Sequence, residues 1–263
     1  MLYQTKNSVG TFYYEYIRYV DFQFEAHMHR HLELIHVQQG TLLLSLNERT
    51  YEVSAGMYAW IPSNCIHAYV TQSESVVDVC IFSEDYVPLF ARETRETKPE
   101  TFLFSCRSSI DCFVREELFV EERIPDIYTL KSALYAITGE LMRQIRFTPA
   151  TGKSEILLDK IIQYVSEHYR ESITLSRMAD ALGYEVHYLS RCFHSSIPMH
   201  FSRYVNLYRV DAALELLKHG DLTIEQIAAE SGFQSVRSFN RVFLEITGKT
   251  PSQYYGGRYE TSG

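Results

Sequence analysis

Long hydrophobic runs and paired cysteines are missing from this sequence of 263 residues. No stretch reaches the roughly 18 consecutive apolar residues that suggest a transmembrane helix, so we expect no membrane span. Its five cysteines are widely spaced and contain no CxxC pair, which argues against a cysteine zinc site or a disulfide framework. Residues 1–7 lack the apolar core of a signal peptide. These absences favour a cytoplasmic protein with reduced thiols.

An excess of positive charge is also lacking. The formal net charge is −8 at pH 7, which argues against a general binder of nucleic acid. Acidic groups concentrate in residues 1–152, whereas residues 153–263 are almost neutral. Within that second part, segments 186–197 and 235–244 contain basic residues and no acid. Local positive charge is all that a DNA reader needs where it meets phosphate.

A motif near the C-terminus occurs twice. Residues 174–184 are echoed by residues 223–233, and each copy has a capping Thr, a short helix with a small Ala on its inner face, and a Gly that ends it. A second short helix is expected after each copy. This is the outline of a helix-turn-helix, whose second helix enters the DNA major groove. One such match has many false positives, but two with the same internal positions are far more specific.

Each second helix divides into a core face and an outer face. Apolar residues four positions apart predict the core: Leu189 with Phe193, and Phe239 with Phe243. The outer faces carry His187, Ser190, Arg191 and His194 in the first unit, and Val236, Arg237, Asn240 and Arg241 in the second. Arg can read guanine, Asn can read adenine, and Val can touch a thymine methyl. The alternative is two generic helix pairs with solvated charges.

Residues 155–255 resemble the DNA-binding region of the AraC/XylS family of bacterial transcription regulators. The second unit carries the strongest stretch: Ile227-Ala228, Gly232-Phe233, Phe239, Arg241-Val242-Phe243, Gly248 and Thr250-Pro251-Ser252, ending in Tyr254. The first unit matches at Ala179, Leu189-Ser190-Arg191, Phe193, Phe201, Tyr204 and Arg209. One departure is Pro198, where the family usually has Gly.

The resemblance implies which residues approach DNA: His187, Ser190, Arg191, Val236, Arg237, Asn240 and Arg241. It also implies a long helix, at about residues 199–218, that fixes the separation of the two units. They would then enter successive major grooves about 34 Å apart on one face of the DNA.

The first 105 residues have a different pattern. β-branched and aromatic residues alternate with turn signals every eight to twelve residues or so, which predicts a barrel or sandwich of short strands. Helices are expected at 107–121 and, from apolar residues at helical spacing, at 126–147. Residues 148–154 are expected to form a linker, because Pro and Gly interrupt both periodicities.

A histidine-rich motif lies within these strands. His27, His29 and Glu33 have the same parity, so all three can face one side of a strand. With His67 they could form a metal site of three histidines and one carboxylate. The pattern resembles the two motifs of the cupins, which are small β-barrels, although Asn64 stands where the second motif usually has Gly. Sensor domains of AraC-like regulators often keep a similar pattern while binding an organic ligand. A divalent metal, an organic ligand pocket and structural histidines therefore all remain open.

We accordingly expect an α+β chain in three parts. Residues 1–105 form a cupin-like ligand-sensing barrel, residues 106–154 a helical dimerisation segment and linker, and residues 155–263 an all-α DNA-binding domain with two helix-turn-helix units. The expected ligand-binding residues are His27, His29, Glu33, His67 and Trp60, the single tryptophan, whose ring could stack on a sugar or pack in the core.

The expected function is transcription regulation rather than catalysis. A homodimer would bind promoter DNA, and a small-molecule effector, such as a sugar or related metabolite, would shift its conformational population. No cofactor is expected beyond a divalent metal in the barrel. Two alternatives remain: a metal-dependent cupin enzyme with a helical appendage, and a regulator whose barrel is only a dimerisation scaffold. The doubled motif argues against the enzyme, which has no need of two DNA readers.

Overall fold

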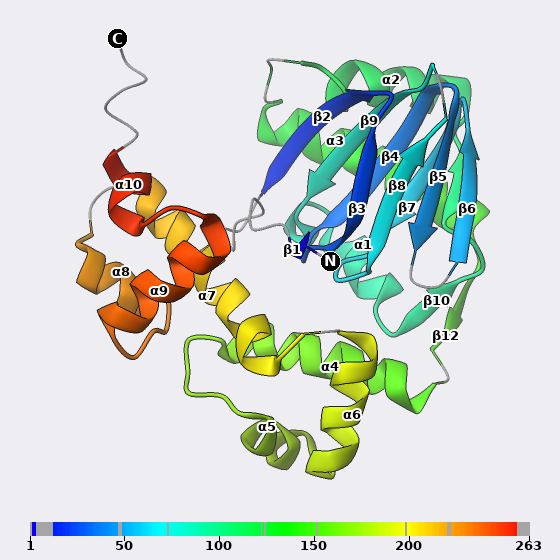
Figure 1. Ribbon diagram of the computed structural model, residues 1–263. Helices are drawn as coiled ribbons and strands as arrows, with labels where there is room; N and C mark the ends of the chain where they lie inside the picture. The colour runs from blue at the N-terminus through cyan, green and yellow to red at the C-terminus, as the bar shows by residue number, and fades with distance from the viewer. Residues whose placement is uncertain are drawn as a thin grey trace. The chain divides into compact units, whose positions relative to one another are not determined.

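The computed structural model describes residues 2–3, 13–46, 49–72, 74–121, 123, 125–150, 152–197, 199–219 and 222–256 (Figure 1). The described residues up to Pro149 form one compact unit, and those from Ala150 onward form a second. The first unit combines strands and helices, whereas the second is helical. The expected α+β class is confirmed.

Two five-stranded sheets form the frame of the first unit. The sheet called here the β3 sheet contains, in spatial order, β1 (Leu2–Tyr3), β3 (Gln23–Met28), β8 (His67–Thr71), β5 (Thr41–Leu46) and β6 (Arg49–Ser54). The β4 sheet contains β11 (Leu103–Ser105), β7 (Met57–Ile61), β4 (Leu32–Gln39), β9 (Val76–Phe82) and β2 (Tyr14–Val20). The β-rich N-terminal domain is thus as expected, but its described strands form two separately hydrogen-bonded sheets and not one closed barrel.

The alternation of residues along β4 explains why two layers of core exist. Ile35 and Val37 belong to a cluster between the two sheets, whereas Leu32 and Leu34 belong to a cluster between the β4 sheet and helices. Successive side chains of a strand point to opposite faces, so a strand that is apolar on both faces is covered on both. Each fully buried Leu, Ile or Val contributes about 1.5–3 kcal/mol to folding.

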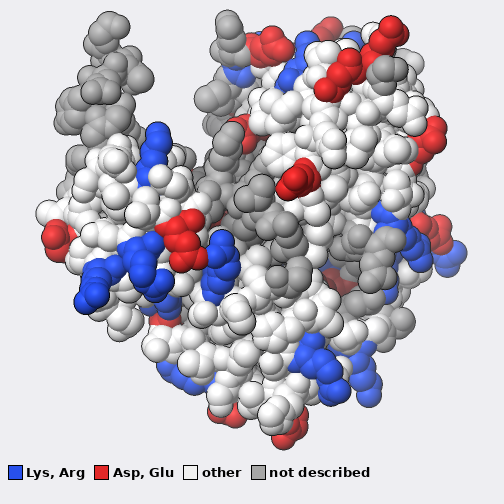
Figure 2. Space-filling model, viewed as in Figure 1, with Lys and Arg blue, Asp and Glu red and all other residues white. Residues whose placement is uncertain are grey.

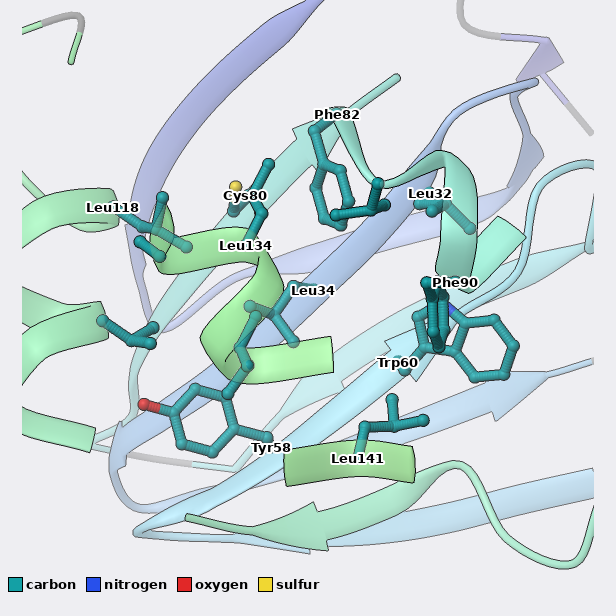
Figure 3. Packing of buried hydrophobic residues seen from close by; sticks show 14 of the residues in the cluster. Leu32, Leu34, Tyr58, Trp60, Cys80, Phe82, Phe90, Leu118, Leu134 and Leu141 are labelled. Atoms are coloured by element: carbon teal, nitrogen blue, oxygen red, sulfur yellow. The ribbon is translucent and has the colours of Figure 1, made fainter. Parts of the chain in front are cut away.

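Helices cover the outer face of the β4 sheet. They are α2 (Ser108–Leu118), α3 (Ile127–Gln144) and the short α1 (Pro88–Thr94), which follows the 3-10 turn η1 (Glu84–Tyr86). Figure 3 shows Leu118, Leu134 and Leu141 against side chains of the sheet. α2 and α3 agree with the expected helices. The expectation of strands alone before residue 106 was wrong at α1, which is too short for a helical period to show and begins with Pro88.

The linker is shorter than expected. Phe147–Pro149 forms β12, which pairs antiparallel with β10 (Thr97–Pro99), and α4 (Lys153–His168) begins before the expected linker ends. Only residues 150–152 separate the two elements. The prediction failed because Pro149 was taken as an interruption, whereas proline is tolerated where a strand edge needs no N–H donor.

The second unit contains the two expected helix pairs. They are α5 (Leu175–Leu182) with α6 (Val186–Ser196), and α8 (Ile224–Glu230) with α9 (Val236–Thr247). α7 (Phe201–His219) is the expected long helix, and α10 (Pro251–Gly256) follows the second pair. Pro198 lies outside the described residues. The capping signals are confirmed: Thr174 accepts from the Arg177 N–H at 3.2 Å, and Thr223 forms a capping box with Gln226.

The matching glycines of the two pairs have unequal surroundings, which gives a testable difference. Gly183 and Gly232 both have positive φ, +72° and +89°. A Cβ added at Gly183 would meet no atom within 4 Å, whereas at Gly232 it would lie 2.5 Å from the Arg170 Cα. We expect Gly183→Ala to cost about 1–2 kcal/mol through backbone strain alone. Gly232→Ala should cost a further 1–3 kcal/mol or so by displacing the Arg170 backbone. Urea unfolding followed by circular dichroism measures both, and equal losses would contradict the packing argument.

Candidate functional site

The second helix of the first pair, α6, has one buried and one open face. Leu189, Cys192 and Phe193 are buried, which confirms the core assignment of Leu189 and Phe193. The residues of this helix predicted to approach DNA lie on the remaining surface, where His187 and Arg191 are exposed and Ser190 is half-buried. His194, which was predicted only to lie on the same outer face, is exposed as well. A helix held by its apolar side therefore presents imidazole, hydroxyl and guanidinium groups outward.

The corresponding helix of the second pair, α9, is arranged in the same way. Phe239, Val242 and Phe243 are buried. Arg237, Asn240 and Arg241 are exposed, and Val236 is half-buried and packs partly against the core. In Figure 2, Lys and Arg side chains gather over α9. The open face of α9 thus combines positive charge with an amide, which suits phosphate contact and base readout.

Sequence reasoning missed an acidic partner of this face. The Glu245 carboxylate lies 3.8 Å from the Arg241 guanidinium and 2.5 Å from that of Arg203 on α7. About half of the Glu245 side chain is exposed, so both ion pairs are weak surface pairs. They orient the Arg241 guanidinium but leave it able to contact DNA. The spacing of four residues from Arg241 was the available signal.

The four residues predicted as metal ligands converge in the first unit. One potential ligand atom from each of His27, His29, Glu33 and His67 lies within 4.8 Å of the others. All four side chains are buried, with 1–2% of their surface exposed. This group is called the histidine cluster below.

The histidine cluster joins the two sheets. His27 and His67 are directly opposite each other in the antiparallel pair β3–β8, and Glu33 comes from β4 in the other sheet. His29 lies between β3 and β4. The expectation that His27, His29 and Glu33 share one strand was therefore wrong, because the chain crosses from one sheet to the other at residues 29–31. The residues still converge, since this crossing folds Glu33 back over the end of β3.

Each histidine is held in one orientation by its own backbone environment. The Nδ1 atoms of His27, His29 and His67 lie 2.9, 3.0 and 2.9 Å from the carbonyl oxygens of Glu25, His31 and Cys65. A carbonyl oxygen only accepts, so each Nδ1 carries the hydrogen and donates it. The Nε2 atoms are then left for the interior of the cluster. Metal-bound histidines are oriented by the same kind of second hydrogen bond.

Glu33 is the centre of the polar contacts. Its Oε2 atom lies 2.6 Å from His29 Nε2 and 3.3 Å from His67 Nε2, and its Oε1 accepts from the Tyr69 hydroxyl. Burial opposes ionisation of Glu33, but the neighbouring His67 and the hydrogen bond from His29 outweigh it and lower the pKa of the carboxyl. Tyr69 was missed by sequence reasoning, although it has the parity of His67 in the same strand.

The contact between His29 and the Glu33 carboxylate requires a proton or another positive charge inside the cluster. His29 donates from Nδ1 to a carbonyl and meets the Glu33 carboxylate with Nε2, which requires either a second ring proton or a cation in its place. His67 Nε2 is buried and makes no hydrogen bond within the described part of the chain. Burial and the neighbouring His67 lower the pKa of His27 to about 4, so its ring is neutral at pH 7. Neutral imidazoles around a carboxylate are a fitting donor set for a divalent metal.

Trp60 does not lie with the histidine cluster. In β7 it stands opposite Leu34, on the outer face of the β4 sheet, whereas Glu33 points between the sheets. Its ring is 5% exposed and packs 5.3 Å from the ring of Phe90 (Figure 3). The prediction that Trp60 shares a ligand site with the histidines was wrong in placement, because the facing of a strand residue depends on a register that parity alone does not give. Trp60 instead packs in the hydrophobic core, which was the alternative expected from the sequence.

Comparison with known proteins gives two family matches along the chain. Residues 9–164 match the AraC-like ligand binding domain family, and residues 178–256 match a helix-turn-helix domain family. The transcriptional activator RhaR of Escherichia coli (strain K12) is 26% identical over 251 residues, which cover 90% of this chain and 89% of RhaR. The RhaR protein of Shigella flexneri has the same identity and coverage.

Solved structures are similar in fold. ToxT from Vibrio cholerae superimposes with a TM-score of 0.56 over 97% of this chain and 100% of ToxT, at 18% sequence identity. Among the described helices, none combines the length and apolar character that crossing a membrane requires.

Proposed function

This chain belongs to the AraC family of transcription regulators, and from that premise we propose a function for each of its domains. α6 and α9 enter neighbouring major grooves of promoter DNA, and the N-terminal domain places two such readers by forming a homodimer. A small-molecule effector in that domain shifts the population between dimer arrangements. The observation that carries the proposal is the repeated helix pair with an exposed, basic face on its second helix.

Base reading is assigned to the outer faces of α6 and α9. The proposed contacts are those expected from the sequence: His187, Ser190, Arg191, Val236, Arg237, Asn240 and Arg241. The exposure of Arg237, Asn240 and Arg241 supports a direct role. The partial burial of Val236 supports an apolar contact made from the edge of the core.

Replacing Arg237 tests base reading. We expect Arg237→Ala to weaken binding to the selected site by about 1–3 kcal/mol and to relax the preference at one base pair, because a bidentate contact to guanine is lost. A pool of random duplexes selected by the full chain supplies the site, and footprinting with gel-shift titration measures affinity and preference. Arg146→Ala, which removes an exposed guanidinium of the first unit, is the matched control and should change neither. Unchanged preference in Arg237→Ala would remove this residue from the reading face.

The histidine cluster is proposed to bind one divalent metal. His27, His29, Glu33 and His67 would hold it, and the metal would supply the positive charge that His29 otherwise takes from a second proton. The burial of all four side chains supports a structural or sensory role, since a catalytic metal keeps a position open to substrate. The similarity to transcription regulators also supports a protein that is not an enzyme.

α3 is proposed as the homodimer contact. Tyr128 is 84% exposed and Tyr135 is 39% exposed, and their spacing of seven residues puts both on one side of the helix. Ile127 adds a third exposed apolar side chain at the start of the same helix. Two exposed tyrosines and an exposed isoleucine on one helix support a protein partner. A second copy of this chain is the partner that would bring two DNA-binding domains to one promoter. We place this dimer in the cytoplasm, with the promoter.

A further inference from the structure

Both helix pairs of the second unit are attached to α7, each to a different half of it (Figure 1). In the first half, the ring centroids of Phe201 and Tyr204 lie 5.4 and 5.5 Å from that of Phe193 in α6. The second half shares a buried core with α8 and α9 through Val210, Ala213, Leu214 and Leu217. Arg209 lies at the boundary between these two attachments.

The guanidinium of Arg209 is bonded to the turn that follows α4. Its Nε and one Nη donate to the carbonyl oxygens of Tyr169 and Glu171, both at 2.8 Å. Carbonyl groups at the C-terminus of a helix lack partners within the helix, and an Arg side chain satisfies them. Since α4 packs against α5 and α6, these hydrogen bonds tie α7 to the first helix pair at a second point.

The same guanidinium faces the turn of the second helix pair. Its Cζ atom lies 5.8 Å from the ring centroid of Phe233, which follows α8 and belongs to the core of the second pair. A planar guanidinium can cover an aromatic ring while its edge still donates hydrogen bonds. Arg209 therefore contacts both helix pairs with one group.

A direct backbone contact lies beside this bridge. Gly232 packs so closely against the turn after α4 that an added Cβ would lie 2.5 Å from the Arg170 Cα. Arg170 is the residue between the two carbonyls that Arg209 binds. The turn after α4 thus contacts the second pair through Gly232 and, by way of Arg209, through Phe233. Contacts at two points restrain rotation of one pair about α7 as well as its distance from the other.

We propose that Arg209 is a positioning residue that locks the two helix pairs into one rigid reader. The lock sets the number of base pairs between the two groups of bases that α6 and α9 contact. This inference rests on the proposed function of these helices in reading DNA. One added base pair moves the second group by about 3.4 Å along the duplex and rotates it by roughly 35°. A rigid reader cannot follow that change, whereas a reader hinged at α7 can.

A role of Arg209 in folding alone predicts a different result. Loss of folded protein lowers binding to every duplex by the same factor, so the ratio of affinities for two duplexes stays constant. Loss of the lock lowers the ratio between the selected spacing and an altered spacing, because the loosened reader adapts to both. This ratio of affinities is called the spacing ratio below.

The test uses the full chain and short duplexes that carry one site selected from the random pool. Footprinting locates the two protected groups of bases, and one base pair is inserted or deleted between them. Arg209→Met removes the guanidinium and keeps an unbranched stem. Arg203→Met is the matched control, because it makes the same change on α7 at a guanidinium that is half exposed. Gel-shift titration should give a spacing ratio of at least ten for the wild type and Arg203→Met, and below three for Arg209→Met.

Arg209→Lys covers the case in which Arg209→Met does not fold. Its ammonium keeps the positive charge, but it lacks the planar fork that bonds to both carbonyls and covers the Phe233 ring. We expect this variant to reduce the wild-type spacing ratio at least threefold. The base preference within each protected group should stay unchanged in both variants, because neither alters the outer face of α6 or α9.

Several outcomes would overturn the lock. They are a wild-type chain that tolerates altered spacing, a wild-type spacing ratio in folded Arg209→Met or Arg209→Lys, and an equal loss of the ratio in Arg203→Met. Each of these leaves DNA reading by the two helices standing. Failure of the wild-type chain to select any sequence, or to protect two groups of bases, would instead overturn the proposed function on which the lock rests.

Discussion

Isolated residues 153–263 are expected to bind a paired DNA site about 10²–10⁴-fold more weakly than the full chain. In a dimer the second reader binds at an effective concentration set by its tether, whereas the fragment must bind each half-site from solution. The fragment begins at the first residue of α4 and keeps both helix pairs and their cores. Its base preference should therefore equal that of the full chain, and no effector should change it.

Gel-shift titration of the fragment and the full chain, on one half-site and on the paired site, measures this difference. The double variant Tyr128→Glu/Tyr135→Glu in the full chain is the informative control, since it places charge on the proposed dimer face of α3 and should bind like the fragment. Equal affinity of fragment and full chain for the paired site would show that dimerisation contributes nothing to binding.

The helix pairs could be predicted in detail because their signals are local. A capping Thr, an Ala on the inner face and a Gly at the turn lie within eleven residues, and this motif occurs twice in the sequence. Apolar spacing of four residues then gave the buried faces of α6 and α9. The unequal packing of Gly183 and Gly232 could not be predicted, since the contact of Gly232 is with Arg170, far away in the sequence.

The histidine cluster was predicted with the right residues and the wrong geometry. Parity suggested one strand, but the cluster depends on the pairing of His27 with His67 and on a crossing between sheets. Strand partners forty residues apart leave no mark in local periodicity. Trp60 failed for the same reason, because which sheet face it occupies follows from its pairing with Leu34.

A polar row across the β4 sheet, formed by Arg18, His36 and Asp78, gave no usable signal at all. These are charged or polar residues scattered among strands, and such residues ordinarily mark the solvent face of a sheet. His36 and Asp78 are buried here because α2 and α3 pack over that face, whereas Arg18 on β2 stays exposed. Only the register that aligns all three shows them as one network.

Protein purified without chelators is expected to contain about one divalent metal per chain, and its removal should destabilise the first unit. A metal present at a thousand times its dissociation constant adds about 4 kcal/mol to the free energy of unfolding. His29→Ala and Glu33→Gln should both abolish binding, because each removes one of the four ligands of a buried site. Elemental analysis gives the metal content, and thermal unfolding with and without chelator gives the stability.

His31→Ala separates metal loss from general damage. His31 is as buried as the ligands and stacks on Tyr13, but it is not in the metal-competent group. Its backbone carbonyl, which accepts from His29 Nδ1, survives the substitution. This variant should lose stability and keep its metal. A wild-type chain that is metal-free and indifferent to chelator would instead leave His29 doubly protonated beside Glu33. Glu33→Gln would then cost about 3–5 kcal/mol by breaking a buried ion pair, with no metal involved.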